Sequence, residues 1–353
     1  MKNLEKYCIK HDSNIRNAIK KIDIGGIGFA VVMDDKENVI GVISDGDFRR
    51  AILKGVNLND SVLKIMNSNF KFLEDVCLDD EKASYLRQLE VEVLPVIKEH
   101  NLIDLIIYGS SSKGRKQRKG KQINIPVVIM AGGKGARLSP FTKVLPKPLI
   151  PIGELSVIEI IMNKFHEYGM NQFYLSLNYK AGVIKAYIKE AKIPYKIDFI
   201  DEEKELGTAG SLNYLKGKIK TDFFVSNCDV IIKKNYYDIY KLHKENNNAL
   251  TVITSLQHYK IPYGVCKIEN GGSLKEIQEK PEYDILINTG MYLLAPESLD
   301  YIPENKFFHV TELINILLSK GLKVGTYPVS EKSYTDIGQW KEYKDAVRTF
   351  LID

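Results

Sequence analysis

Strand-like and helix-like stretches alternate from residue 125 onward, and this alternation restricts the fold more than any other feature of the sequence. The apolar run IPVVIM is typical of a buried strand, and SVIEIIMNKFHEYG is typical of an amphipathic helix that begins with a Ser156–Glu159 capping box. Strand-like QFYLSLN, helix-like AGVIKAYIKEA, strand-like YKIDFI, helix-like AGSLNYLKG and strand-like DFFVSN follow in turn. The pattern predicts an α/β fold with a mostly parallel sheet and helices on both faces, in which ligands bind at the carboxyl ends of the strands.

The segment GSSSKGRKQRKGKQ predicts a domain boundary. A chain of 353 residues favours two domains over one, and this segment contains no large apolar residue. We therefore expect a first domain over residues 1–108, a basic flexible linker over 109–122 and a second domain over 123–353. The linker holds six basic residues, which is more than the net charge of +5, and has no aromatic residue among them. A solvated linker is favoured over a nucleic-acid surface, and we expect no nucleic-acid partner.

The sequence gives no indication of a membrane or of a secreted protein. Its first residues, MKNLEKYCIKHDSNIRNAIKK, lack the apolar run of a signal peptide, and no later run is long enough to span a bilayer. The four cysteines lie far apart without metal-ligand spacing. We expect a cytoplasmic protein with free thiols and no membrane partner.

An internal repeat precedes the linker. FAVVMDDKENVIGVIS and VLPVIKEHNLIDLIIY each contain two apolar runs around a polar turn. The first follows the helix-like stretch NIRNAIKKI and the second follows the helix-like stretch DDEKASYLRQL. The first copy continues through Ser44 and Asp47 into a helix, and there it resembles a pair of cystathionine-β-synthase-type (CBS) domains. The resemblance implies a regulatory module in which Ser44 and Asp47 bind an adenine nucleotide.

Two alternatives to a nucleotide site stay open in this module. Ser44 and Asp47 fit equally well as the cap and first turn of a helix. The second copy has Asp104 and Ile107 where the first has Gly41 and Ser44, so the sequence supports at most one nucleotide site. A structural or oligomerising role is the other reading, and we expect a homo-oligomer of unspecified size.

Glycines and basic residues follow the first predicted strand of the second domain. Glycines at 132, 133 and 135 allow a sharp turn whose N–H groups can point at an anion. Phosphate is the expected ligand of such a turn. The spacing does not match a Walker A loop, nor a dinucleotide fingerprint, which has glycine where Leu138 stands. Arg137 offers a fork to phosphate oxygens, and Lys147 lies on a segment stiffened by two prolines. These residues suit a triphosphate that builds up charge during displacement.

The run AGGKGARLSPFTKVLPKPL is similar to the signature of the sugar-1-phosphate nucleotidyltransferases. They join a sugar 1-phosphate to a nucleoside triphosphate (NTP) and release pyrophosphate, on a Rossmann-like, GT-A-like sheet with Mg²⁺. ELGTAGSL, FFVSNCDV, QEKP, INTGMY and YTDIGQW match later motifs of the family, so the resemblance covers roughly residues 125–350.

The resemblance implies a role for each matching residue. Catalytic residues would be Arg137, Lys147 and Lys280, the last of which would steer the sugar phosphate. Nucleotide-binding residues would be Ala131, Gly132, Gly133, Gly135, Asn178, Gly207 and Thr208. Sugar phosphate-binding residues would be Glu279, Asn288 and Gly290. Asp229 and Asp336 would hold Mg²⁺, which needs only one or two carboxylates beside substrate phosphates.

Several of these residues also have a purely structural reading. Thr208 could cap a helix, Asp229 could be an exposed residue at a strand end, and Asp336 could belong to a turn. The apolar run LINTGMYLL disfavours a turn at Asn288. The implied reaction needs no Ser-His-Asp triad and no thiol, because the attacking oxygen of the sugar phosphate is already anionic.

The arrangement of CBS-like repeats, basic linker and catalytic pattern resembles a bacterial subgroup of guanylyltransferases. This subgroup includes the glucosamine-1-phosphate guanylyltransferase type that feeds legionaminic acid synthesis, and LSLNYKAGVI also resembles the guanylyltransferase branch. The resemblance implies GTP and glucosamine 1-phosphate as substrates. A uridylyl- or cytidylyltransferase and a catalytically inactive nucleotide sensor are the alternatives.

Overall fold

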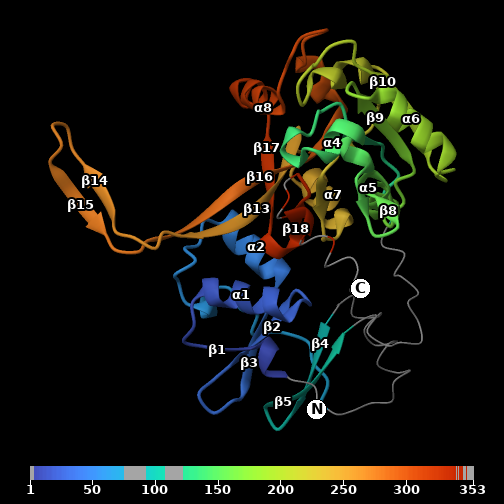
Figure 1. Cartoon of the computed structure of the whole chain (residues 1–353). Coiled ribbons are helices and arrows are strands. Elements are labelled where there is room, and N and C mark those ends of the chain that lie inside the picture. The colour runs from blue at the N-terminus through green and yellow to red at the C-terminus, as the bar shows by residue number, and fades with distance from the viewer. Residues whose placement is uncertain are drawn as a thin grey trace. The chain divides into compact units, whose positions relative to one another are not determined.

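The computed structural model describes residues 4–74, 93–107, 122–338, 340, 342–344 and 347, and these form two compact units (Figure 1). Unit 1 comprises Met1–Arg118 and His258–Asp284, and unit 2 comprises Lys119–Gln257 and Ile285–Asp353. The expected linker before Gln122, the helix-like stretch DDEKASYLRQL and Cys77 lie outside the described residues. The sequence assigned 258–284 to the second domain, whereas the structure groups this segment with the N-terminal unit.

A seven-stranded sheet forms the centre of unit 2, in the order β10-β9-β6-β11-β16-β13-β17. Strands β10, β9, β6 and β11 are parallel neighbours, β17 is parallel to β13, and β16 runs antiparallel to β11. This mostly parallel sheet confirms the predicted fold class. The strands are β6 (Val127–Met130), β9 (Gln172–Leu177), β10 (Lys196–Asp201), β11 (Phe223–Asn227), β13 (Leu250–Lys260), β16 (Glu282–Leu294) and β17 (Val324–Val329).

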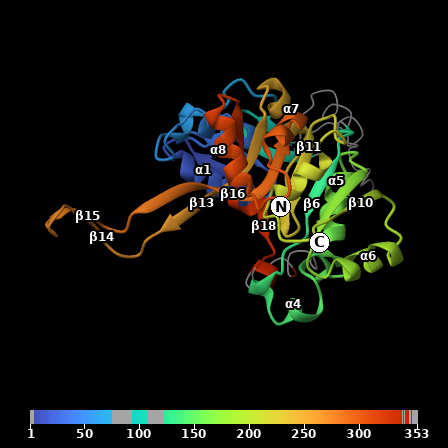
Figure 2. The same cartoon turned by 90° about the horizontal axis from the view of Figure 1, so that it is seen from above.

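Helices cover both faces of this sheet. Because side chains alternate along a strand, Val127 and Ile129 of β6 face one apolar core, and Val128 and Met130 face a second one. The first core contains side chains from α5 (Val157–His166), α6 (Ala181–Glu190) and α7 (Tyr236–Glu245), and the second contains side chains from α8 (Val310–Ser319). Figure 2 shows α5 and α6 beside β6 and β10.

Two predicted helix starts have different outcomes. Glu159 Oε2 accepts hydrogen bonds from the backbone N–H and the hydroxyl of Ser156, which confirms the predicted capping box. The predicted helix AGSLNYLKG is instead a 3₁₀ segment, η5 (Gly210–Leu215). Its first residue, Gly210, lies so close to Lys306 that a Cβ atom there would come within 2.5 Å of the Lys306 carbonyl oxygen. Glycine and asparagine also give this segment a low intrinsic helix propensity.

Short elements connect the main layers of unit 2. The helical ones are η3 (Ala136–Leu138), α4 (Phe141–Val144), η4 (Lys147–Leu149), η6 (Pro296–Tyr301) and η7 (Glu331–Ser333). The strands form two small antiparallel pairs, β7 (Pro151–Ile152) with β8 (Leu155–Ser156), and β12 (Val230–Ile232) with β18 (Tyr334–Asp336).

Unit 1 contains the two copies of the predicted repeat as antiparallel strand pairs. The first copy has α1 (Ile15–Gly25), β2 (Phe29–Met33), β3 (Val39–Ser44) and α2 (Asp45–Leu53), and the second has β4 (Val93–Lys98) and β5 (Asn101–Ile107). One buried cluster joins Val31 and Val42 of the first pair to Val93 and Leu105 of the second. Strand β1 (Cys8–Lys10) pairs with β2, and η1 (Leu4–Tyr7) and η2 (Val62–Lys64) complete this part.

The remaining segment of unit 1, His258–Asp284, is a ribbon that lies between two stretches of unit 2 in the sequence. Beyond the ends of β13 and β16 the chain forms a second antiparallel pair, β14 (Val265–Ile268) with β15 (Leu274–Gln278), as Figures 1 and 2 show. Residues 258–284, which include the outer ends of β13 and β16, are called the ribbon below.

Candidate active site

The glycine loop after β6 lies at the carboxyl end of the parallel strands, as predicted. Ala131 donates its N–H to the Ser176 carbonyl at the end of β9. A Cβ atom on Gly132 would lie 3.2 Å from Asn178 Cβ, whereas Gly133 has open space around it. Gly135 has a φ of +65°, a left-handed conformation that favours glycine. The loop is therefore tightly packed at Gly132 and has open space at Gly133.

Lys147 comes from the short η4 segment and meets the loop from the side. A Cβ atom on Gly135 would lie 3.0 Å from Lys147 Cβ, so the lysine stem packs directly against the glycine. The Lys147 side chain is only 12% exposed, and its ammonium group forms an ion pair with Asp229. A lysine held this closely has a fixed position, unlike an ordinary surface lysine.

The antiparallel pairing of β12 with β18 brings the two predicted metal-binding aspartates together. Val230 pairs with Asp336, and Ile337 donates its N–H to the Asp229 carbonyl at 2.8 Å. A Cβ atom on Gly338 would lie 2.7 Å from Asp336 Oδ1 and 2.9 Å from both Asp229 Oδ2 and Arg137 Nη2. Three side chains from distant parts of the sequence thus surround one residue that has no side chain of its own.

The electrostatics of this cluster affect Asp336 most clearly. Burial, and next to it the negative charge of Asp229, raise the pKa of the Asp336 carboxyl above its usual range, while the Gly338 N–H, Lys147 and Arg137 act in the opposite direction. The oxygen atoms of Asp229 and Asp336 are of the hard type that Mg²⁺ prefers. Within the described ranges no group of three or more His, Cys, Asp or Glu residues has the arrangement of a metal site, so phosphate and water oxygens would have to complete this one.

Cys228, next to Asp229, is not a nucleophile. Its side chain is buried, and burial raises its pKa to about 12. The thiolate is the reactive form of cysteine, so this thiol is inert at neutral pH.

The second predicted loop packs against the start of α8. Gly207 has a φ of +76°, and a Cβ atom there would lie 2.6 Å from the Phe308 carbonyl oxygen. Thr208 Oγ1 accepts the N–H of Val310 at 3.0 Å, so this hydroxyl caps α8 rather than the segment that follows Thr208 in sequence. Thr208 therefore has a structural contact, but it differs from the predicted cap, because the hydroxyl bonds to the start of α8.

Glu202 links the glycine loop to the loop at Leu206, and no role was predicted for it from the sequence. Its Oε1 atom would lie 3.3 Å from a Cβ on Gly132 and accepts the Ser176 hydroxyl at 2.6 Å, while its Oε2 atom accepts the Leu206 N–H at 3.2 Å. Asn178 Nδ2 donates to the Glu202 carbonyl at 2.8 Å. The only available signal was the acidic run DEE directly after the strand-like YKIDFI.

The four residues predicted for the sugar phosphate are divided between the compact units. Asn288 and Gly290 lie on β16 in unit 2, where Asn288 Oδ1 accepts the Gly290 N–H at 3.0 Å. A Cβ atom on Gly290 would lie 2.3 Å from Asn227 Nδ2, which places Gly290 beside the end of β11. Glu279 and Lys280 lie in the ribbon of unit 1, with both side chains exposed and their charged atoms 3.9 Å apart.

The regulatory residues predicted in the first repeat form a helix cap. Ser44 is the N-cap of α2, its hydroxyl accepts the Asp47 N–H at 3.3 Å, and Asp47 Oδ2 accepts the Ser44 N–H at 2.9 Å. Arg50 forms an ion pair with Asp47. This is the structural alternative, and it leaves the nucleotide hypothesis for these residues as a prediction.

Comparison with known protein families identifies two regions. The model of the nucleotidyl transferase family matches residues 126–351, and the CBS domain model matches residues 4–54, which is the first copy of the repeat. No helix in the described residues combines the length and the apolar character that a membrane span requires.

Curated relatives match about two thirds of the chain. The chain is 31% identical over 245 residues to a UTP–glucose-1-phosphate uridylyltransferase of Synechocystis sp., with 64% of this chain and 63% of that protein covered. It is 31% identical over 234 residues to the probable mannose-1-phosphate guanylyltransferase 1 of Oryza sativa subsp. japonica, with 64% of each covered. The chain therefore spans less than two thirds of the length of these relatives.

A solved structure shares the fold over part of this chain. The crystal structure of HddC from Yersinia pseudotuberculosis superimposes with a TM-score of 0.51 at 26% sequence identity, and the match covers 64% of this chain and 99% of HddC.

Proposed function

This chain belongs to the nucleotidyl transferase family, and we propose that it transfers a nucleotidyl group from an NTP to a sugar 1-phosphate and releases pyrophosphate. The observation that carries the proposal is the convergence of Asp229, Asp336 and Arg137 around Gly338, with Lys147 paired to Asp229. Relatives named for uridylyl and guanylyl transfer to sugar 1-phosphates support the same reaction class.

In the proposed reaction the sugar phosphate supplies the nucleophile. One of its anionic oxygens attacks the α-phosphorus in line, a P–O bond forms, and the bond from the α-phosphorus to the bridging oxygen of pyrophosphate breaks. N–H groups of the glycine loop, together with Arg137 and Lys147, would bind the nucleotide phosphates and neutralise the growing charge. Lys280 would steer the sugar phosphate, and Glu279, Asn288 and Gly290 would bind the sugar.

Asp229 and Asp336 fit a role in holding Mg²⁺. The charge of Asp229 contributes to raising the pKa of the half-buried Asp336 carboxyl, and a cation between the two side chains would relieve this repulsion. Mg²⁺ usually takes one or two carboxylates beside phosphate oxygens. When bound, the ion would supply Lewis-acid polarisation of the α-phosphate. The residues would also keep the triphosphate in the orientation needed for in-line attack.

For the substrates we propose GTP and glucosamine 1-phosphate, which would place the enzyme in legionaminic acid or a related surface-glycan synthesis. The support is the order of CBS-like repeats, basic segment and catalytic pattern, together with guanylyltransferases among the relatives. Uridylyl or cytidylyl transfer to another sugar phosphate is the alternative, and a catalytically inactive nucleotide sensor is the second.

A matrix assay tests this proposal. The full chain is incubated with Mg²⁺, each of GTP, UTP, CTP, ATP and dTTP, and each of glucosamine, N-acetylglucosamine, mannose and glucose 1-phosphate, and product is identified by mass. We expect a GDP-sugar. A UDP- or CDP-sugar would replace the proposed specificity, and absence of any NDP-sugar and pyrophosphate would contradict the transferase.

We further propose that the CBS region binds an adenine nucleotide through Ser44 and Asp47. Binding would have to exchange the present cap, in which the two side chains bond to each other, for bonds to phosphate and ribose. Calorimetric titration of the full chain with AMP and ATP is the test, and Asp47→Ala should remove the binding heat. Titration without heat in the wild type would leave the region a scaffold.

A further inference from the structure

Arg16 lies where a basic residue is electrostatically unfavourable. It is the second residue of α1, whose first turn contains no acidic residue. The N-terminus of a helix carries partial positive charge, so an arginine there is repelled unless carboxylates reach it from outside the helix. The Arg16 side chain is only 11% exposed, and its Nε atom has no hydrogen-bond partner in the described residues. A charge buried in this way needs compensation.

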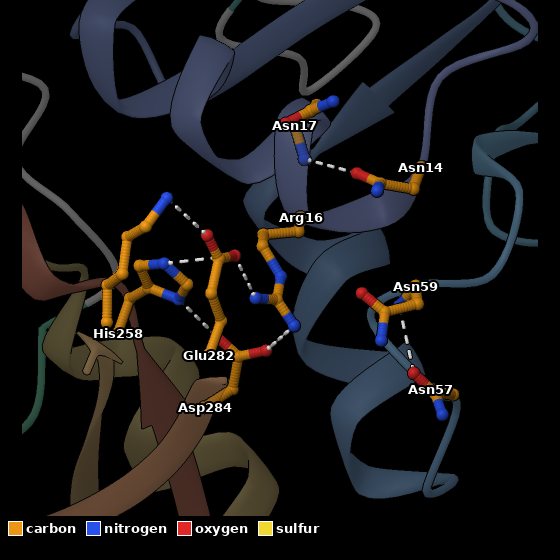
Figure 3. A network of polar contacts seen from close by, with 9 residues as sticks. Asn14, Arg16, Asn17, Asn57, Asn59, His258, Glu282 and Asp284 are labelled. Atoms are coloured by element: carbon orange, nitrogen blue, oxygen red, sulfur yellow. Dashed lines mark hydrogen bonds and ion pairs between the residues drawn. The ribbon is translucent and has the colours of Figure 1, made fainter. Parts of the chain in front are cut away.

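The ribbon supplies that compensation, as Figure 3 shows. Arg16 Nη1 lies 2.7 Å from Glu282 Oε2, and Arg16 Nη2 lies 2.6 Å from Asp284 Oδ2. His258 Nδ1 lies 2.9 Å from the other oxygen of Asp284, and Lys260 Nζ lies 3.3 Å from Glu282 Oε1. One guanidinium therefore holds two carboxylates of β16, and these in turn contact two side chains of β13. We name these five side chains the Arg16 cluster.

Hydrogen bonds fix the start of α1, and they therefore also fix the position of Arg16. The N–H groups of Ile15 and Arg16 donate to the carbonyls of Asp60 and Leu58 at 2.9 and 3.0 Å. The side chain of Asn14 caps the helix by accepting the Asn17 N–H at 2.9 Å. These bonds fix the helix terminus from two sides, which leaves the guanidinium little freedom to follow a moving ribbon.

The cluster lies next to the two sugar-phosphate residues of the ribbon. Only Pro281 separates Lys280 from Glu282. Lys280 has a φ of +44°, a left-handed conformation that is unfavourable for lysine and is further restricted by the following proline. Such a residue keeps its conformation only where its surroundings enforce it. The Ile261 N–H donates to the Pro281 carbonyl at 3.0 Å, and Glu282 is held by Arg16 and Lys260.

We propose that Arg16, a residue of the CBS region, is a positioning residue for sugar-phosphate binding in the transferase reaction. It fixes Glu282 and Asp284 and thereby the backbone that presents Glu279 and Lys280. The inference rests on the proposed function for its substrate, but its structural part stands on contacts within unit 1 alone. Loss of the guanidinium frees the base of the ribbon, so the sugar phosphate binds less tightly while the nucleotide and the chemical step keep their contacts.

The test compares three variants of the full chain. Arg16→Met removes the charge and keeps an apolar stem, Arg16→Lys keeps a charge but cannot hold two carboxylates with a planar fork, and Lys20→Met is the matched control, an exposed lysine of the same helix. Steady-state kinetics give KM for the sugar 1-phosphate, KM for the NTP and kcat. Hydrogen–deuterium exchange of peptides from 258–284 is measured in the same samples, with β11 peptides as the reference.

We expect Arg16→Met to raise KM for the sugar 1-phosphate about tenfold, with KM for the NTP and kcat within about twofold. Exchange should rise in 258–284 and stay constant in β11. Arg16→Lys should give an intermediate KM, and Lys20→Met should match the wild type. An unchanged KM for the sugar phosphate, or equal changes in both KM values with exchange rising throughout, would overturn the proposal.

Two further outcomes are separated by design. If the wild type forms no NDP-sugar, the proposed function fails. In that case an increase in hydrogen–deuterium exchange confined to 258–284 in Arg16→Met still supports the structural role of Arg16. Unchanged exchange in 258–284 would refute that role. If Arg16→Met does not fold because it leaves carboxylates unpaired, Arg16→Met combined with Glu282→Gln and Asp284→Asn removes the unpaired charges. This triple variant should fold and show the same rise in KM, and a wild-type KM would overturn the proposal.

Discussion

Each compact unit contains a pair of carboxylates beside basic side chains, but the pKa of one carboxyl is raised in unit 2 and the pKa of one carboxyl is lowered in unit 1. In unit 2 burial and the charge of Asp229 raise the pKa of Asp336, whereas in unit 1 a hydrogen bond from Lys260, followed by one from Arg16, lowers the pKa of Glu282. In unit 1 the two carboxylates have ion-pair partners in Arg16 and Lys260. In the described part of the chain no ion pair reaches Asp336 within 4 Å, although Lys147 and Arg137 act on it from further away.

The opposite pKa shifts of Asp336 and Glu282 suggest that carboxylates beside basic residues have a different role in each unit, structural in unit 1 and, under the proposed function, ligand-binding in unit 2. A carboxylate pair that is neutralised by its own chain holds two segments together and has little to offer a ligand. A pair in which one carboxylate has no ion-pair partner within 4 Å, as is the case for Asp336 in the described residues, costs stability and attracts a cation. The Arg16 cluster fits the first description, and the cluster around Gly338 fits the second.

The largest expected effect tests this assignment directly. Asp229→Asn keeps the shape of the side chain but removes the charge that would hold Mg²⁺ and that pairs with Lys147, and we expect kcat to fall by about 10³. Glu282→Gln should keep kcat within about threefold and raise only KM for the sugar phosphate. Steady-state assays of both variants, with circular dichroism to check folding, give the comparison. Similar losses of kcat would mean that the two clusters do not differ in function.

A second substitution perturbs the cluster around Gly338 without changing any charge. Gly338→Ala would place a methyl group within 3 Å of Asp336, Arg137 and Asp229, so these side chains must move apart, and we expect kcat/KM to fall by up to about 10². The matched control is Gly182→Ala in α6, where a Cβ atom meets nothing within 4 Å. Full activity of Gly338→Ala would show that the three side chains need not converge for turnover.

The sequence predicts the elements of the sheet well because they depend on local patterns. The apolar runs at β6, β9, β10 and β11 and the helix with the Ser156–Glu159 capping box follow from spacing within about a dozen residues. The glycine loop is also local, since three glycines after a strand need no partner to be recognised. The 3₁₀ segment at Gly210 was mispredicted because contact with a carbonyl far along the chain decides its geometry.

The residues that the sequence did not reveal depend on long-range pairing. Gly338 lies among Arg137, Asp229 and Asp336 because β18 pairs with β12, more than 100 residues away. Glu202 connects two loops because its carboxylate reaches both Gly132 and Leu206. Arg16 looked like one more basic residue of a predicted helix. Its partner Glu282 lies 266 residues further on, in a segment that the sequence assigned to the other domain.

The smallest expected effect sharpens the comparison through pH. The folded-state pKa of Glu282 is lowered from its usual value of 4.5, so the unfolded chain takes up its proton at higher pH than the folded chain. Its contribution to the free energy of unfolding is therefore fully present above pH 4.5 and is lost as the pH falls through the folded-state pKa. Urea unfolding of the wild type and Glu282→Gln should show the variant less stable at pH 7, with the difference shrinking toward pH 4. A difference that is independent of pH would mean that Glu282 stabilises the ribbon by packing rather than by charge, and the contrast with Asp336 would then not be electrostatic.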